Sequence, residues 1–349
     1  MTTVRLRVLS RGGVPFLYLP TRNRAAAHAL KLYPAQSWKA RLAKLLLQIG
    51  FRFSPLRHGG GQPFSLPRQN IFLASLAMTA GQPAGELPEF AVLAGNPHAP
   101  GRRFVFLLFD TAGQPMAVVK AGCSERARAL IAQEAAILRE CGGKIPGVPR
   151  LREESVAGNT VAFATDFIAG NSPDGDARSE LETLFMAWLD TSRKITIRDL
   201  PVWQRLHQSG DPLPAPINQL GQLQVCPTLI HGDLTPWNVK VTAGRWTVLD
   251  WERGERVGLP GWDWFHFVLQ PAVLVKHEPV AKILIRLEQL FAAVEFGRYA
   301  KRAGLAGHEW RFAAAYVSYC LRVTQQTEGR TQLQPLLQEL QNRATVTKP

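Results

Sequence analysis

The residues from Leu229 to Glu252, LIHGDLTPWNVKVTAGRWTVLDWE, decide how the rest of this chain is interpreted. The stretch opens with apolar residues that suit a short strand, and a loop with a Thr-Pro turn follows. Two runs of alternating residues then flank the pair Ala243-Gly244, which predicts a β-hairpin. Because a hairpin aligns the start of one strand with the end of the next, Asn238 and Asp250 are expected at one end of the same two strands.

Three polar side chains in this stretch suit the transfer of a phosphoryl group. That reaction needs positioning and charge neutralisation from the protein more than covalent chemistry. Asp233 can accept a proton from an attacking hydroxyl or simply orient it. Asn238 and Asp250 offer hard oxygen ligands of the kind that Mg²⁺ prefers. The alternative is a hairpin whose Asp and Asn side chains only form turns, and the combined spacing of the polar residues favours the catalytic interpretation.

The order His-x-Asp, an Asn five residues later and then a further Asp is also that of protein kinases. In detail the stretch resembles the aminoglycoside phosphotransferase and choline kinase-like family, whose loop contains His-Gly-Asp, here His231 to Asp233. In that family an aromatic or aliphatic residue follows the metal-binding Asp, and Trp251 fits. The resemblance covers about residues 90–345. It implies that His231 fixes the loop, with direct general-base action as the alternative, and that Asp263 supports the loop by accepting backbone hydrogen bonds.

The residues before the hairpin predict the nucleotide-binding small lobe of such a fold. Strands are expected over 90–93, 103–110 and 116–120. Lys120 ends the last strand, and a helix of about four turns should follow the N-cap Ser124. The resemblance implies that Lys120 contacts nucleotide phosphates and that Glu134, fourteen residues later, holds this lysine in place. Glu125 is the alternative partner, although a carboxylate at a helix start is favoured by the helix dipole in any case.

Further nucleotide contacts follow from the same resemblance. The loop over 94–102 is rich in Gly and Pro but lacks the full G-x-G-x-x-G pattern, and its backbone amides can still bind phosphate. The residues assigned to this contact are Gly95, Asn96 and Gly101. Adenine is expected to bond backbone groups where the two lobes connect, at Asp166 and Phe167. The implied cofactors are ATP and Mg²⁺.

Length and composition fit a globular protein of more than one unit. The chain has 349 residues, of which 46% are hydrophobic, and this exceeds the usual size of one domain. It shows neither an apolar run long enough to cross a membrane nor the apolar block of a secretory signal. The four cysteines lie far apart, which predicts reduced thiols in a cytoplasmic protein.

The first 85 residues are strongly basic. They contain twelve Lys and Arg residues and no Asp or Glu, whereas the remainder has 29 basic and 27 acidic residues. A helix is expected from about Ser37, with Trp38, Leu45 and Leu46 on an apolar face. This face can lie on a membrane surface or pack against the body of the protein. The first alternative would bring residues 1–57 into peripheral contact with the inner face of an anionic membrane, and the second is the commoner fate of such a face. A nucleic-acid partner is not expected.

Together these features predict an α+β, bilobal, protein-kinase-like fold. The expected divisions are a basic N-terminal extension over 1–85, a β-rich nucleotide-binding small lobe over 86–166, and a mainly helical catalytic and substrate-binding large lobe over 167–349.

The predicted function is an ATP- and Mg²⁺-dependent phosphotransferase that acts on a hydroxyl of a small molecule, such as a sugar, a glycan precursor or an amino-alcohol. The C-terminal sequence has no cluster of acidic residues of the kind that binds cationic aminoglycosides, which favours a neutral acceptor. The alternative is a catalytically inactive kinase-like scaffold, docked on an anionic surface by the basic N-terminus. A protein kinase is a third interpretation, and the lack of Phe-Gly after Asp250 counts against it.

Overall fold

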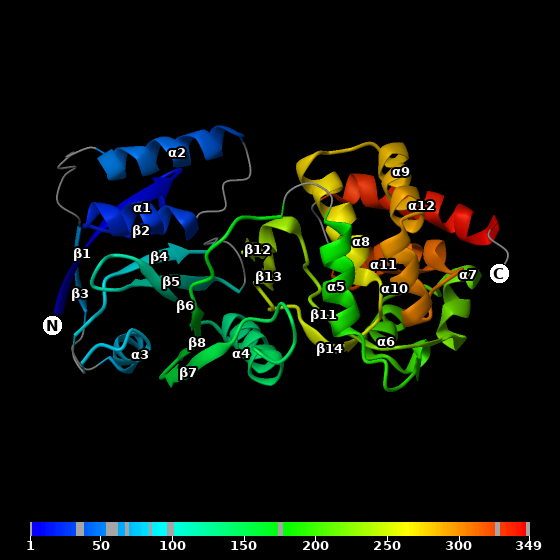
Figure 1. The fold of residues 1–349 in the computed structure, drawn as a ribbon, viewed down its shortest axis with the longest axis horizontal. Coiled ribbons are helices and arrows are strands. Elements are labelled where there is room, and N and C mark those ends of the chain that lie inside the picture. Colours follow the sequence, from blue (N-terminus) through cyan, green and yellow to red (C-terminus); the bar gives the residue numbers. More distant parts are fainter. Residues whose placement is uncertain are drawn as a thin grey trace. The chain divides into compact units, whose positions relative to one another are not determined.

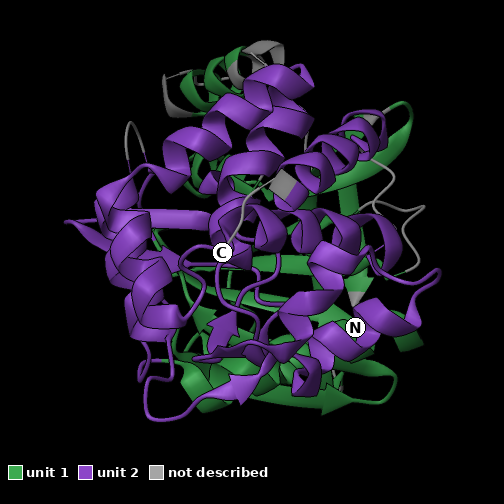
Figure 2. Ribbon diagram, turned by 90° about the vertical axis from the view of Figure 1, so that its right-hand side faces the viewer, with its two compact units in different colours: residues 1–142, 149–168 green, residues 143–148, 169–349 purple. Residues whose placement is uncertain are grey.

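The chain forms two compact units, which Figure 2 shows in different colours. The computed structural model describes residues 2–32, 38–53, 62–66, 70–83, 86–95, 101–173, 177–324 and 329–346. Unit 1 contains residues 1–142 and 149–168, and unit 2 contains residues 143–148 and 169–349. Unit 1 is built on a β-sheet and unit 2 is mainly helical. The predicted α+β class, with a β-rich N-terminal part and a helical C-terminal part, is therefore confirmed.

Unit 1 contains an antiparallel sheet of eight strands in the order β3-β1-β2-β4-β5-β6-β8-β7. The strands are β1 (Thr2–Arg11), β2 (Val14–Pro20), β3 (Gln62–Leu66), β4 (Phe90–Ala94), β5 (Arg103–Phe109), β6 (Pro115–Gly122), β7 (Leu151–Ala157) and β8 (Thr160–Asp166). The three strands expected up to Lys120 are present as β4, β5 and β6.

The basic N-terminal segment contributes strands to this same sheet. Leu17 and Tyr18 of β2 pair with Leu93 and Val92 of β4, and β1 pairs with both β2 and β3. The sheet therefore continues without a break from the N-terminal segment into the strand that carries Lys120. The division of the chain at residue 85 stays a prediction.

Helices cover both faces of the sheet in unit 1. They are α1 (Asn23–Ala29), the 3-10 helix η1 (Leu30–Leu32), α2 (Trp38–Phe53), α3 (Ile71–Thr79) and α4 (Glu125–Cys141). Figure 1 shows α1 and α2 above the sheet and α3 below it. Leu107 and Leu108 are neighbours in β5, yet Leu107 packs in the core beside α1 and Leu108 in the core that includes Leu76 of α3. This alternation is what a strand buried on both faces requires.

The helix α4 begins directly against the end of β6. Ser124 is its N-cap and accepts a hydrogen bond from the backbone N–H of Ala127 at 3.3 Å. A Cβ atom on Gly122 would lie 2.7 Å from the backbone carbon of Ala127, so glycine permits this close approach. Glu134 lies on the buried side of the helix between Ile131 and Leu138, because residues three and four apart share a face.

Unit 2 consists mainly of helices joined by short strands. The helices are α5 (Arg178–Trp188), η2 (Ile197–Asp199), α6 (Pro201–Gln208), α7 (Ala215–Asn218), η3 (Gln219–Gln222), η4 (Pro236–Asn238), α8 (Trp262–Gln270), the π-helix η5 (Pro271–Val275), α9 (Val280–Phe291), α10 (Val294–Ala303), α11 (Glu309–Arg322) and α12 (Arg330–Val346). The strands are β9 (Ile195–Thr196), β10 (Gln224–Val225), β11 (Thr228–Ile230), β12 (Val239–Thr242), β13 (Arg245–Val248) and β14 (Glu255–Gly258). Within the described ranges, none of the helices combines the length and the apolar character needed to cross a membrane.

The expected hairpin is formed by β12 and β13. Val239 pairs with Val248, and the strands turn at Ala243 and Gly244, whose φ angles are 48° and 75°. Two successive positive φ angles are characteristic of the type I′ turn that suits the twist of a two-residue hairpin. The start of β12 therefore lies opposite the end of β13, and this places the residues on either side of the hairpin together.

We predict that Gly122→Ala lowers the thermal stability of the protein. The added methyl group would meet backbone atoms of Ala127 closer than van der Waals contact allows, and overpacking of this kind costs about 1–3 kcal/mol. Gly50→Ala in α2 is the matched control, because a Cβ atom there meets nothing within 4 Å. Melting curves followed by circular dichroism should show a lower midpoint for Gly122→Ala only. Equal midpoints for the two variants would contradict the close packing of α4 on β6.

Candidate functional site

The loop after β11 is fixed by one buried carboxylate. Asp263 lies in the first turn of α8 and is 6% exposed. Its two oxygens accept hydrogen bonds from the backbone N–H groups of His231 at 2.7 Å and Gly232 at 3.0 Å. Gly232 has a φ of 76°, a conformation that glycine adopts at little cost. These bonds hold the main chain of the His-Gly-Asp segment against α8.

His231 is buried and both of its ring nitrogens face backbone groups. Nδ1 accepts a hydrogen bond from the N–H of Asp233 at 3.2 Å, and Nε2 lies 2.8 Å from the carbonyl oxygen of Leu249. Nε2 therefore carries the proton and donates a hydrogen bond to that carbonyl oxygen. Burial lowers the pKa of the imidazole below its ordinary value of 6.5. Because both nitrogens are engaged in this way, the geometry fits a residue that fixes the loop better than a general base.

The side chain of Asp233 has a different neighbour at each oxygen. Oδ1 lies 3.3 Å from Nε2 of His266 and 3.6 Å from a guanidinium nitrogen of Arg253, while Oδ2 lies 3.4 Å from Nδ2 of Asn238. Burial of this carboxyl raises its pKa, but the polar contact with His266 and the charge of Arg253 outweigh burial, so the pKa lies below its usual 3.8. Asp233 is thus a carboxylate at neutral pH, and its side chain is one-third exposed.

Asn238 and Asp250 lie at the same end of the hairpin. The N–H of Leu249 donates to the carbonyl oxygen of Asn238 at 2.7 Å, which places Asp250 one residue beyond that contact. Asn238 uses Nδ2 to donate to the backbone oxygen of Asp233 at 2.8 Å, so its amide oxygen is directed elsewhere. An amide oxygen and a carboxylate at one hairpin end are a donor set that fits a hard divalent cation.

The backbone at Asp250 is in the left-handed region, with a φ of 71°. A residue with a Cβ atom adopts this conformation at a cost, and such strain is concentrated at functional sites. The next residue, Trp251, is fully buried, and its Nε1 donates to the carbonyl oxygen of Val248 at 2.8 Å. The anchoring of Trp251 therefore holds Asp250 in a conformation that the local chain would not choose.

In unit 1, Lys120 and Glu134 form a close ion pair. Nζ of Lys120 donates to both carboxylate oxygens of Glu134, at 2.7 and 2.8 Å. The side chain of Glu134 is 3% exposed and that of Lys120 is 17% exposed. Lys120 is held in register between Val105 of β5 and Phe163 of β8. The ammonium group of Lys120 is thus partly accessible at the sheet, and the buried carboxylate of Glu134 fixes its direction.

The other residues assigned to nucleotide binding lie in backbone contacts of the sheet, against α4 or at the surface. Gly95 pairs with Arg103 through its N–H, and a Cβ atom there would lie 2.8 Å from the carbonyl oxygen of Arg103. Gly101 is buried against the side chains of α4. Asn96 lies outside the described residues. Asp166 is exposed and lies 3.4 Å from Arg152, and the N–H of Phe167 bonds to the carbonyl oxygen of Met116.

Sequence reasoning missed two residues that face Asp233. His266 is 6% exposed and lies three residues after Asp263 on α8, and Arg253 follows the hairpin. The pattern WDWFHF is dominated by aromatic residues, so it indicates core packing. A single polar residue one helical turn after a loop-supporting Asp was the only signal for His266, and it does not specify a partner.

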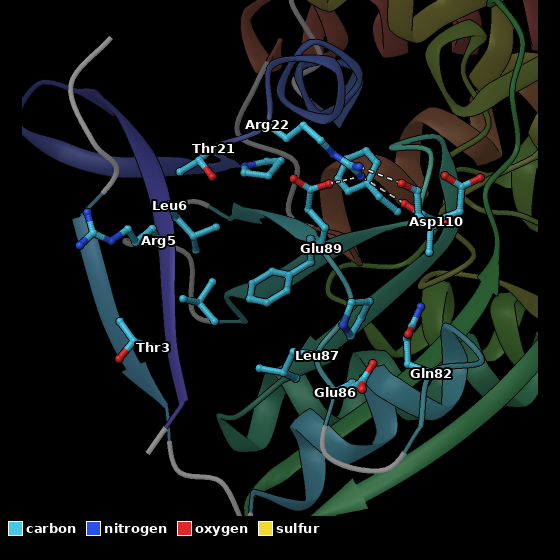
Figure 3. A pocket seen from close by; sticks show the side chains of 16 residues that line it. Thr3, Arg5, Leu6, Thr21, Arg22, Gln82, Glu86, Leu87, Glu89 and Asp110 are labelled. Carbon is cyan, nitrogen blue, oxygen red and sulfur yellow. Dashed lines mark hydrogen bonds and ion pairs between the residues drawn. The ribbon is translucent and has the colours of Figure 1, made fainter. Parts of the chain in front are cut away.

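A cavity of about 720 Å³ in unit 1 is lined by none of the predicted site residues. Figure 3 shows the side chains that line it. The cavity lies beside β1, β2 and the segment before β4. Arg22 forms an ion pair with Glu89 at 2.5 Å and donates to the carbonyl oxygens of Asp110 and Thr111. Arg22 and Glu89 in this cavity thus neutralise each other, and the candidate site is defined by the residues described above.

The comparisons with known proteins give structural neighbours only. No family model matches the chain, and no curated protein matches it. A thermostable variant of aminoglycoside phosphotransferase APH(4)-Ia, solved with AMP-PNP and hygromycin B, is similar at 14% identity and a TM-score of 0.49, covering 81% of this chain and 100% of its own. Amicoumacin kinase hAmiN, in complex with AMP-PNP, Ca²⁺ and Ami, is similar at 11% identity and a TM-score of 0.40, covering 72% and 88%.

We predict that the stability of unit 2 falls between pH 7.5 and pH 5.5, and that His231→Gln reduces the fall. Folding lowers the pKa of His231, so the unfolded state takes up a proton near pH 6.5 and the folded state does not. The contribution of His231 to the free energy of unfolding is therefore present above pH 6.5 and is lost as the pH drops. At pH 5.5 the free energy of unfolding should be lower by about 1 kcal/mol. Urea unfolding followed by tryptophan fluorescence at both pH values provides the measurement. An equal fall in the two proteins would contradict a buried neutral imidazole.

Proposed function

We propose that the chain is an ATP- and Mg²⁺-dependent phosphotransferase that transfers the γ-phosphoryl group to a hydroxyl of a small molecule. The observation that carries this proposal is the loop fixed by Asp263, which presents the Asp233 carboxylate next to Asn238 and the strained Asp250. The Lys120–Glu134 pair of unit 1 supports it independently. Phosphoryl transfer depends on positioned charges and needs little covalent chemistry from the protein.

In this reaction Asp233 accepts a hydrogen bond from the acceptor hydroxyl and orients its oxygen toward the γ-phosphorus. The new oxygen–phosphorus bond forms as the bond from that phosphorus to the bridging oxygen of ADP breaks, and the hydroxyl proton passes to Asp233. Because the pKa of Asp233 is lowered, the carboxylate is a weak base and its orienting role comes first. Magnesium held by Asn238 and Asp250 would neutralise charge on the phosphate oxygens.

Lys120 has the complementary task of binding phosphate oxygens. Its ammonium group is fixed by Glu134, so less side-chain entropy is lost when it meets a phosphate. Backbone amides near Gly95 and Gly101 would contribute further phosphate contacts, and Asn96 is assigned there from the sequence alone. Backbone groups at Asp166 and Phe167 are assigned to adenine.

The surroundings of Asp233 favour an acceptor that is not a polycation. Arg253 lies 3.6 Å from the Asp233 carboxylate, and a second positive charge there would be repelled. A sugar or a glycan precursor fits this environment better than an aminoglycoside, and an amino-alcohol is the smallest cationic alternative. An inactive scaffold remains the second candidate, and Mg²⁺-dependent ATP binding without transfer to any acceptor would favour it.

We predict that Asp233→Ala abolishes turnover and leaves ATP binding within about twofold. An ATP-consumption screen over amino-alcohols, aminoglycosides, free sugars and nucleosides first identifies an acceptor. Loss of the orienting carboxylate should then lower kcat by a factor on the order of 10²–10⁴, whereas the dissociation constant for ATP should not change. Asp199→Ala, at an exposed position of unit 2, is the control. Equal turnover in Asp233→Ala and the parent protein would end the proposed mechanism.

We also propose peripheral contact of α2 with an anionic membrane surface. The apolar residues of this helix at three- and four-residue spacing face solvent, with Leu42 48%, Leu45 51%, Leu46 60% and Ile49 45% exposed. The side chains of Trp38 and Phe53, expected on the same face, lie outside the described residues. An exposed apolar face within a segment that has twelve basic and no acidic residues is complementary to anionic headgroups.

We predict that Leu45→Glu/Leu46→Glu prevents flotation of the protein with liposomes that contain phosphatidylglycerol. Each substitution places a negative charge on the face that would enter the headgroup region. Ile285→Glu is the control, because Ile285 is 50% exposed on α9 of unit 2. Point variants are preferable to deletion of the first 85 residues, since deletion removes β1, β2 and β3 from the sheet. Equal flotation of both variants at low salt would remove the proposal.

A further inference from the structure

His266 is connected on both sides of its ring. Nε2 lies 3.3 Å from Oδ1 of Asp233, and Nδ1 lies 2.7 Å from the hydroxyl oxygen of Tyr316 on α11. The hydroxyl of Tyr316 in turn accepts a long hydrogen bond from Nε2 of Gln270 at 3.5 Å. All three supporting side chains are buried. The result is a line of polar groups that runs from the inside of unit 2 to the carboxylate proposed for catalysis.

The direction of the hydrogen bonds follows from the chemistry of Tyr316. Burial raises the pKa of its phenol well above 10, so the hydroxyl keeps its proton. Gln270 donates to the hydroxyl oxygen. Cys320 also contacts this hydroxyl, and Nδ1 of His266, at 2.7 Å, is the nitrogen that we assign as acceptor of the phenolic proton. An imidazole that accepts a hydrogen bond at Nδ1 carries its proton on Nε2. That proton is on the nitrogen that lies 3.3 Å from Oδ1 of the Asp233 carboxylate. Nε2 of His266 has no hydrogen-bond partner with good geometry among the described residues, so the attraction to Asp233 is electrostatic.

The same helix therefore controls two parts of the loop. Asp263 and His266 are three residues apart on α8 and share a face. Asp263 holds the backbone N–H groups of His231 and Gly232, and His266 faces the side chain of Asp233. With Oδ1 turned toward His266, Oδ2 is the oxygen for the acceptor hydroxyl; it accepts a long hydrogen bond from Nδ2 of Asn238 at 3.4 Å and has a second lone pair.

We infer that His266, with its tautomer set by Tyr316, is the positioning residue for the Asp233 carboxylate, an assignment that rests on the proposed phosphotransferase function. It acts through Asp233 and does not itself contact the acceptor. Without the N–H of His266, the carboxylate can rotate about its Cβ–Cγ bond, and the hydroxyl loses its fixed direction. The expected loss appears in kcat and not in the binding of ATP, because misdirection affects the transition state.

Two substitutions of similar size separate this role from core packing. His266→Gln keeps an N–H donor near the place of Nε2 and loses the acceptor at Nδ1. His266→Asn keeps a polar group near the place of Nδ1 and loses the donor toward Asp233. Both variants remove the aromatic ring, so their melting temperatures should fall alike. A role in packing alone would make their activities fall alike as well.

The test compares kcat and the KM for ATP in the two variants with the acceptor found in the screen. We expect His266→Asn to lower kcat by about tenfold to a hundredfold, His266→Gln to stay within about fivefold of the parent protein, and the KM for ATP to change by less than about twofold in both. Equal kcat in the two variants, or a change confined to the KM for ATP, would overturn the assignment.

A second measurement is independent of turnover. Nitrogen-15 NMR of labelled histidine should show His266 with the proton on Nε2, and Tyr316→Phe should convert this signal into a mixture of tautomers. A proton on Nδ1 in the parent protein would overturn the orientation of the network even if the protein is active. Absence of ATP turnover with every acceptor, alongside the expected NMR result, would instead end the proposed phosphotransferase function.

Discussion

The geometry of the candidate site depends on the two hydrogen bonds that Asp263 accepts from the catalytic loop. The acceptor is a buried carboxylate. Burial raises the pKa of Asp263 because it disfavours the charged form, and the two hydrogen bonds oppose this effect. Both of its oxygens accept hydrogen bonds from backbone N–H groups, and such charge-assisted bonds are stronger than bonds between neutral groups. A loop with a glycine at positive φ has little stiffness of its own, and these bonds supply it.

The sequence was sufficient for the hairpin because it is encoded within one short segment, whereas the support by Asp263, which lies more than thirty residues from the loop, was implied by the family resemblance. A two-residue turn between alternating strands determines which residues lie opposite each other, so the proximity of Asn238 and Asp250 follows from register alone. The ion pair of Lys120 in β6 with Glu134 in the middle of α4 was likewise implied by the resemblance, on the spacing of fourteen residues between them.

Other features could not be predicted because they depend on which elements meet in space. The pairing of β2 with β4 joins residues more than seventy positions apart, and strand pattern does not specify a partner across such a distance. His266 belongs to a helix with an aromatic pattern, and its role appears only when α11 brings Tyr316 to its other side. The sequence pattern of α2 is the same whether its apolar face packs against the protein or lies on a membrane. Only the structure shows that Leu45 and Leu46 on this face are exposed.

Costs to stability accumulate at the residues assigned to catalysis. A buried ion pair such as Lys120 with Glu134 contributes less to stability than apolar side chains of the same volume would. Asp250 has a strained backbone, and the carboxylate of Asp263 is buried. A chain that served only as a scaffold could lose each of these features and gain stability, since mutations that relieve strain are common. Their presence together in one chain therefore favours an active enzyme over an inactive kinase-like scaffold.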